Sequence, residues 1–195
     1  YQLAKQVGVK FYFDTKVEKI TVHEGEAKGV TTKYGFHKAD RVVSNMDVVG
    51  TYEKLLKTED KPTKIINQPK SSSALIFYWG IKKEFKQLGL HNIFFSEDYN
   101  HIFSQGTITS DPTIYINITS THKKDDAPEG SQNWFTMINV PNNQGQDWDQ
   151  LIKEAKANIL KKLSLQLGED IEPLIEVEDV LDPRSIELRT SSSQG

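Results

Sequence analysis

The feature that most constrains this chain is an almost unbroken apolar run, Ala74-Leu-Ile-Phe-Tyr-Trp-Gly-Ile81. The run is too short to span a membrane, and its aromatic and β-branched residues favour a strand over a helix. Because polar and apolar residues do not alternate in it, the run is typical of a central strand covered on both faces. We therefore expect the second part of the chain to build a sheet around this strand.

The segments after this run extend the expected sheet and cover it. Partial alternation and turn residues predict strands, and a 3.6-residue apolar stripe between Asp147 as cap and Gly168 as stop predicts a long helix. The expected elements are strands at Asn92–Phe95, Thr113–Thr121 and Asn133–Val140, a helix at Trp148–Leu167 and a strand at Leu174–Val180. The long polar connection between the second and third of these strands indicates an antiparallel pair. The predicted fold class is α+β, with a mostly antiparallel sheet and helices.

The first part of the chain has shorter elements. Its expected elements are a helix end at Tyr1–Val7, a strand at Val9–Phe13, a hairpin of Val17–His23 and Lys28–Lys33, a strand at Ala39–Val43 and a helix at Asp47–Leu56. Residues 58–71 contain Pro62 and Pro69 among polar residues and are predicted to be a linker.

Both ends of the chain suggest a piece of a longer protein. The chain opens at Tyr1 inside an amphipathic helical pattern, and it closes on polar residues after a basic, loop-like segment, Asp182–Arg189. We therefore expect an excised fragment, and motifs missing here are expected in neighbouring segments.

Composition excludes several classes of function. The net charge of −3 gives no field that would attract nucleic acid, and with no cysteine the chain has neither a disulfide framework nor a thiolate site. The five histidines lack a spacing that would place two metal ligands on one helix face, so no metal site is predicted. No two glycines stand two apart, which excludes the dinucleotide fingerprint from this sequence. We expect a cytoplasmic protein, with peripheral membrane contact as an alternative.

The second part of the chain is rich in aromatic residues. Aromatic side chains dominate protein cores, and strands present alternate residues to opposite faces, so these residues form either a core or one wall of an elongated apolar pocket. Composition favours the core.

Ordered motifs add a resemblance to a known family. In the first part they are Ala4-Lys-Gln-Val-Gly-Val-Lys-Phe11, Thr15-Lys-Val-Glu-Lys-Ile20 and Ala39-Asp-Arg-Val-Val-Ser-Asn-Met-Asp47, which resemble flavin-dependent desaturases and amine oxidases. In the second part, Leu90–Tyr99 and Asp182–Arg189 resemble the phytoene desaturase and carotenoid oxidoreductase group. The resemblance covers nearly the whole chain.

The resemblance implies a domain organisation. Residues 1–57 would be a β-meander portion of a Rossmann-like FAD domain, 58–71 a linker, 72–181 a substrate-binding domain, and 182–195 the start of a C-terminal FAD segment. The implied cofactor is FAD, held by the parent enzyme, and the implied substrate is a lipophilic polyene or isoprenoid that loses hydride to the flavin.

The resemblance also implies site residues, while the catalytic residues and the oligomeric state stay unknown. The main chain of Val17 would meet the adenine, and Ser44, Asn45 and Met46 would lie nearest the flavin, with a plain helix cap as the alternative. The substrate-binding candidates are Phe77, Trp79, His91, Phe95, Tyr99 and Tyr115.

Two other functions remain open. A related flavoprotein could act as a saturase or a polyene isomerase, and product analysis separates these from a desaturase. A non-catalytic lipid-binding module is the alternative from another class, favoured by the absent glycine fingerprint.

Overall fold

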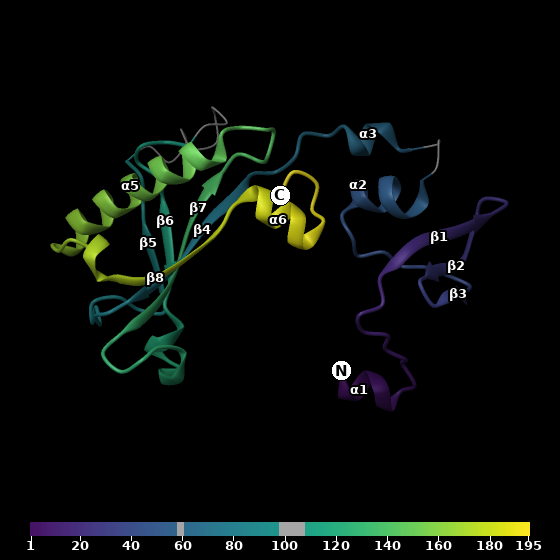
Figure 1. Cartoon of the computed structure of the whole chain (residues 1–195), viewed down its shortest axis with the longest axis horizontal. Coiled ribbons are helices and arrows are strands. Elements are labelled where there is room, and N and C mark those ends of the chain that lie inside the picture. Colours follow the sequence, from purple (N-terminus) through teal and green to yellow (C-terminus); the bar gives the residue numbers. More distant parts are fainter. Residues whose placement is uncertain (58–60, 98–107) are drawn as a thin grey trace. The chain divides into compact units, whose positions relative to one another are not determined.

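The computed structural model describes residues 1–57, 61–97 and 108–195. It consists of two compact units, Tyr1–Gln68 and Pro69–Gly195 (Figure 1). The division falls inside the segment 58–71.

The first unit is a three-stranded antiparallel sheet with short helices. Its elements are α1 (Gln2–Gln6), β1 (Val17–His23), β2 (Glu26–Thr32), β3 (Gly35–Lys38), α2 (Val48–Gly50), the π-helical turn η1 (Thr51–Leu56) and α3 (Thr63–Ile66). The strands follow the order β1-β2-β3, which confirms the expected hairpin and adds a third strand. The hairpin turns at Glu24 and Gly25, whose φ angles of 51° and 78° suit the twist of the strands.

A helix is confirmed at Asp47–Leu56, although only its first turn is α-helical. The Asp47 carboxylate accepts hydrogen bonds from the backbone N–H groups of Val49 at 2.8 Å and Gly50 at 3.4 Å, which fixes the start of α2. The following turn, η1, packs against β1.

Two strands predicted in this unit are absent from residues 1–57, so those predictions are wrong. Val9–Phe13 and Ala39–Val43 have no strand assignment, and most of their apolar side chains are exposed, Val43 to 95% and Phe13 to 66%. A strand needs a hydrogen-bonded neighbour, and the three strands of this unit pair only with one another.

The second unit is a five-stranded sheet with one long helix on it. Its elements are β4 (Ser73–Ile81), β5 (His91–Phe94), β6 (Ile114–Asn117), η2 (Thr119–Thr121), η3 (Lys124–Asp126), β7 (Gln132–Val140), α5 (Trp148–Leu167), η4 (Glu172–Leu174), β8 (Ile175–Leu181) and α6 (Pro183–Thr190). The strand order is β5-β6-β7-β4-β8, and each neighbouring pair is antiparallel. The predicted α+β class with a mostly antiparallel sheet is confirmed.

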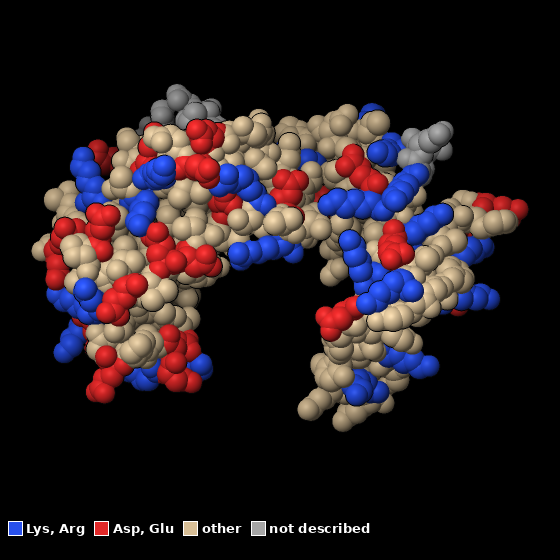
Figure 2. All heavy atoms as spheres, viewed as in Figure 1, with Lys and Arg blue, Asp and Glu red and all other residues tan. Residues whose placement is uncertain are grey.

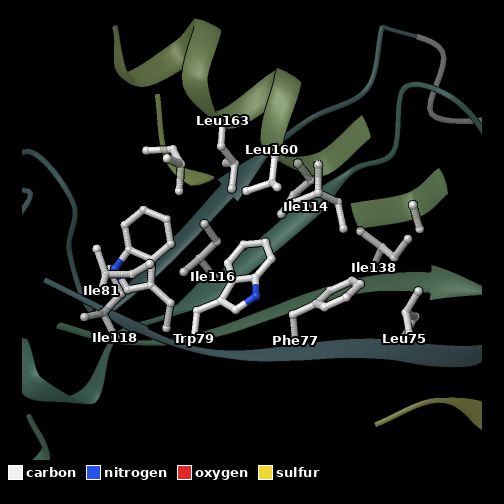
Figure 3. Packing of buried hydrophobic residues seen from close by; sticks show 14 of the residues in the cluster. Leu75, Phe77, Trp79, Ile81, Ile114, Ile116, Ile118, Ile138, Leu160 and Leu163 are labelled. Atoms are coloured by element: carbon white, nitrogen blue, oxygen red, sulfur yellow. The ribbon is translucent and has the colours of Figure 1, made fainter. Parts of the chain in front are cut away.

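The core lies between this sheet and α5. Figure 3 shows the side chains of Leu75, Phe77 and Trp79 pointing from β4 toward Leu160 and Leu163 of α5. Burying side chains of this size contributes about 1.5–3 kcal/mol each, so this layer is the main source of the unit's stability.

The prediction that β4 is covered on both faces is wrong. Alternate residues of β4 are buried under α5, but Tyr78, on the opposite face, is 39% exposed. The apolar run in the sequence therefore marks a strand with one core face and a second face on which Ile76 is buried and Tyr78 is accessible.

The segment Asp182–Arg189, expected as a loop, contains α6. Asp182 caps this helix by accepting a hydrogen bond from the backbone N–H of Ser185 at 2.8 Å, and Pro183 occupies the first turn. Burial opposes ionisation of Asp182, yet the bonds from Ser185 and Arg184 keep its pKa below the usual value.

Charged side chains of both signs are mixed on the surface of the second unit. Figure 2 shows Lys and Arg side chains interspersed with Asp and Glu over the visible face of the second unit, without one continuous basic surface. Among the helices in the described ranges, none has the length and apolar content needed to cross a bilayer.

Candidate functional site

The face of the five-stranded sheet opposite α5 carries aromatic and aliphatic side chains that remain accessible. Strand register places Tyr78 opposite Phe135 and places Tyr115 opposite both Met137 and Ile93. Because side chains alternate along a strand, these residues share the face that α5 does not cover. Tyr78 is 39% exposed and Ile93 is 55% exposed. We call this surface the open face.

Four rings form a continuous row across the open face, which we call the aromatic row: Tyr78, Phe135, Tyr115 and His91. Ring centroids are 5.5 Å apart for Tyr78 and Phe135, 6.2 Å for Phe135 and Tyr115, and 6.1 Å for Tyr115 and His91. The first two contacts are edge-to-face and the third is stacked, which are favourable ring geometries. Since neighbouring strands lie about 4.8 Å apart, the row from β4 to β5 spans roughly 14 Å.

The β5 end of the row is polar. His91 Nδ1 lies 2.8 Å from the Tyr115 hydroxyl and 3.2 Å from Asn117 Nδ2, and Asn117 Nδ2 also donates to the Leu90 carbonyl at 3.0 Å. We call His91, Tyr115 and Asn117 the polar cluster. Two of the predicted site residues, His91 and Tyr115, are therefore brought together.

Phe77 and Trp79 lie on the other face of the sheet. Phe77 is 0% exposed and Trp79 is 2% exposed, both packed under α5, and Trp79 Nε1 donates to Glu178 Oε2 at 2.6 Å. The structure thus places these two predicted substrate residues in the core, away from His91 and Tyr115. The site proposed below does not include them.

Phe95 and Tyr99 complete the predicted substrate set. Phe95 follows β5, its side chain is 66% exposed, and its carbonyl accepts a hydrogen bond from Lys162 Nζ at 2.7 Å. Tyr99 lies outside the described residues.

Sequence reasoning did not single out Asn117 as a site residue, and it did not separate Tyr78 and Phe135 from the other aromatics. The available signal was strand parity, because positions 115 and 117 must share a face. Which strands are neighbours decides whether such residues meet, and that information comes from the fold.

Val17, the expected adenine contact, is the first residue of β1. It is half-buried and pairs with Thr32, and the ladder is irregular between Val17 and Lys19. The main-chain contact of Val17 with an adenine stays a prediction.

Ser44, Asn45 and Met46 lead into α2. The Ser44 hydroxyl is hydrogen-bonded to the Thr51 hydroxyl at 2.8 Å, and Thr51 also donates to the Met46 carbonyl at 3.4 Å. Asn45 is exposed. The segment therefore serves the start of the helix, and Asn45 keeps a side chain directed to solvent.

Comparison with solved structures shows that the fold is known. No family model matches the chain. A solved oxidoreductase from Methanosarcina mazei has a similar fold, with a TM-score of 0.54 and 16% identity over 85% of this chain and 36% of that chain.

Curated relatives give the family. The chain is 51% identical over its whole length to 1-hydroxycarotenoid 3,4-desaturase of Flavobacterium sp. (strain P99-3), 30% identical over 93% of its length to phytoene desaturase of Fusarium fujikuroi, and 31% identical over its whole length to 4,4'-diaponeurosporene oxygenase of Staphylococcus aureus (strain MRSA252). The chain belongs to the carotenoid desaturase family of oxidoreductases. It spans 41%, 37% and 41% of the length of these three relatives.

Proposed function

We propose that this chain supplies the substrate-binding domain, and part of the FAD domain, of an oxidoreductase that desaturates a long polyene by hydride transfer to flavin. The observation that carries the proposal is the aromatic row on the open face. A conjugated hydrocarbon is a long, flat, apolar rod, and a line of accessible rings on a rigid sheet offers it dispersion contacts along its length.

The exposure of the open face implies that other parts of the enzyme must cover the substrate. Ile93 and Val177 are 55% and 67% exposed on it, so the described residues of this chain offer a wall and not an enclosed tunnel. Enclosure, which would exclude water from the reacting bond, requires cover from other segments of the complete natural protein.

We further propose that the first unit belongs to a Rossmann-like FAD domain. Residues 9–13 and 39–43 lack strand partners within residues 1–57 and carry exposed apolar side chains, among them Tyr12, Phe13 and Val43, which supports cover from other segments of the complete natural protein. In the proposed enzyme, the Val17 main chain would meet the adenine and Asn45 would reach toward the flavin. Bound FAD would supply the hydride acceptor, while this chain would hold and orient the polyene.

The proposal needs a product test, because relatives of this chain include both desaturases and an oxygenase. The complete natural protein that contains this sequence should purify with bound FAD and convert a carotenoid to a product lacking two hydrogen atoms, read by mass spectrometry. A product that gained oxygen, a reduced product or a double-bond isomer would replace desaturation by one of those reactions. A protein without flavin that leaves each carotenoid unchanged would remove the proposal.

A lipophilic substrate also suggests that the enzyme binds it at a membrane. We propose a cytoplasmic enzyme that contacts membranes peripherally, since Ile93 and Phe95, two residues apart in the sequence, present exposed apolar side chains. Co-sedimentation of the complete protein with lipid vesicles tests this, and the double variant Ile93→Ser, Phe95→Ser should reduce the bound fraction.

A further inference from the structure

The hydrogen bonds of the polar cluster indicate which ring nitrogen of neutral His91 carries the proton. Asn117 Nδ2 donates to the Leu90 carbonyl at 3.0 Å, which identifies this atom as the amide nitrogen, so its 3.2 Å contact with His91 Nδ1 is also a donor contact. His91 Nδ1 therefore accepts hydrogen bonds, from Asn117 and from the Tyr115 hydroxyl at 2.8 Å. In the neutral ring the proton then sits on Nε2.

This arrangement leaves one donor and one acceptor for a ligand. Within the described ranges, no hydrogen bond uses His91 Nε2, and the Tyr115 oxygen donates its proton to His91 and keeps lone pairs. His91 is exposed and Tyr115 half-buried, so both groups can be reached from the open face. An alcohol, which donates and accepts, matches this pair.

The position of the polar cluster limits the kind of ligand that it can bind. Tyr115 and His91 are at once members of the polar cluster and the last two rings of the aromatic row, so a ligand lying along the row would bring its end to the cluster. The three residues carry no fixed positive charge, which favours a neutral hydroxyl over a carboxylate or phosphate. A hydrocarbon end would instead bury Nε2–H and the phenol oxygen without partners, which is unfavourable.

We propose that His91 and Tyr115 bind the hydroxyl group of a hydroxylated polyene end and so select oxygenated polyenes over hydrocarbons. This inference rests on the proposed function and adds a specificity determinant to it. Asn117 is a positioning residue, since it fixes the ring nitrogen that accepts.

The experiment compares two substrates in the complete natural protein with FAD bound. The probes are a polyene with a hydroxyl group at one end and the same polyene without it, and kcat/KM is measured for each. Tyr115→Phe removes the hydroxyl and keeps the ring, and His91→Phe keeps the stack and removes both nitrogens. Each should reduce the preference for the hydroxylated substrate by roughly 3- to 10-fold, the effect of one hydrogen bond.

Matched controls and a second readout keep the test decisive. Tyr34→Phe and His122→Phe make the same chemical changes at exposed residues that belong neither to the aromatic row nor to the polar cluster, and should leave the preference unchanged. Binding of each polyene is also followed by quenching of tryptophan fluorescence, so a protein without turnover still reports a preference. A wild-type protein that binds FAD and desaturates but does not prefer the hydroxylated polyene would overturn this inference and leave the proposed function standing.

Three other outcomes would also overturn it. Equal losses on both substrates in His91→Phe would indicate a role in the reaction itself and not in selection. A loss of preference in Tyr78→Phe but not in Tyr115→Phe would place the hydroxyl at the other end of the row. Unaltered preference in both cluster variants would show that the hydroxyl is bound elsewhere.

Discussion

Tyr78 and Trp79 are consecutive in β4, yet one is 39% exposed on the open face and the other is 2% exposed under α5. The alternation of the strand separates a surface available to a ligand from the core that supports it. Phe77, next to Tyr78 on the other side, is also buried, while Ile76, on the face of Tyr78, is buried to 7% exposure, so the open part of β4 is centred on Tyr78.

The two faces should respond differently to truncation. Trp79→Ala leaves a large cavity beneath α5 and removes the indole hydrogen bond to Glu178, whose carboxylate keeps its ion pair with Lys156, so we expect a loss of about 3–5 kcal/mol in the free energy of unfolding. Tyr78→Ala should cost no more than about 1.5 kcal/mol, since much of its ring is already in water. Urea unfolding followed by circular dichroism measures both, and equal losses would contradict the assignment of faces.

Removing the hydroxyl group of Thr136 should stabilise the protein. Its Oγ1 is buried in the core and has no hydrogen-bond partner in the described part of the chain. Thr136→Val replaces the hydroxyl by a methyl group of similar size, so we expect a gain of about 1 kcal/mol. The matched control is Thr113→Val, because Thr113 Oγ1 accepts from the Ser96 N–H at 3.0 Å, and it should lose stability. Stabilisation by both variants would argue against the polar explanation.

Lys162 links α5 to the segments on either side of the undescribed residues 98–107. Its Nζ donates to Asp111 Oδ1 at 2.6 Å, to the Phe95 carbonyl at 2.7 Å and to the Pro112 carbonyl at 3.1 Å. Its hydrogen bond to Asp111 holds the pKa of that carboxyl below the usual value of 3.8, against desolvation, and the Glu97 N–H adds to the lowering.

The sign of the pH dependence follows from this lowered pKa. Stability from the Lys162–Asp111 pair should be fully present above about pH 4 and should be lost as the pH falls through the folded pKa. Because the Asp111 side chain is 42% exposed, the pair itself should contribute under about 1 kcal/mol. Asp111→Asn should flatten the acid limb of stability against pH, and Lys162→Met should flatten it and also lose the two carbonyl bonds. An unchanged acid limb in Asp111→Asn would assign the dependence to other carboxylates.

Local sequence patterns predicted most of the elements whose backbone hydrogen bonds join residues close in the sequence. The stripe of Trp148–Leu167 and its caps gave the bounds of α5, and the hairpin residues gave the β1–β2 turn. The strand predictions for Val9–Phe13 and Ala39–Val43 were wrong because a strand forms only beside a partner strand. Strand propensity does not tell whether such a partner is present.

The direction of side chains was the second feature that could not be predicted from the sequence. Phe77, Trp79 and Tyr115 had equal standing in the sequence as aromatic strand residues, and only the position of α5 decides which of them are core. The polar cluster required the β5–β6 register, which sets His91 opposite Asn117. Such pairings between strands cannot be read from one sequence without the neighbours' identity.

Gly29 should tolerate no side chain. Its φ is +147°, and a Cβ there would lie 2.1 Å from the His37 carbonyl oxygen of β3. We expect Gly29→Ala to destabilise the three-stranded sheet by about 2 kcal/mol or more. Gly25→Ala is the control, because its Cβ meets nothing within 4 Å and only the positive φ of +78° opposes it, which costs about 1 kcal/mol. Amide hydrogen exchange in β1–β3 reads this unit alone, and equal exchange in both variants would contradict the steric explanation.

The last prediction concerns the cofactor. The chain has no glycine fingerprint to hold a pyrophosphate, and its proposed FAD contacts are limited to the Val17 main chain and the residues near Asn45. A few such contacts cannot offset the loss of freedom of a bound dinucleotide, so this chain alone should neither retain FAD through gel filtration nor convert a carotenoid. Isothermal titration with FAD provides the measurement, and the complete natural protein is the positive control. A tight affinity in this chain alone would mean that the dinucleotide is gripped by groups other than a glycine-rich loop, and the division of the FAD site proposed above would then be wrong.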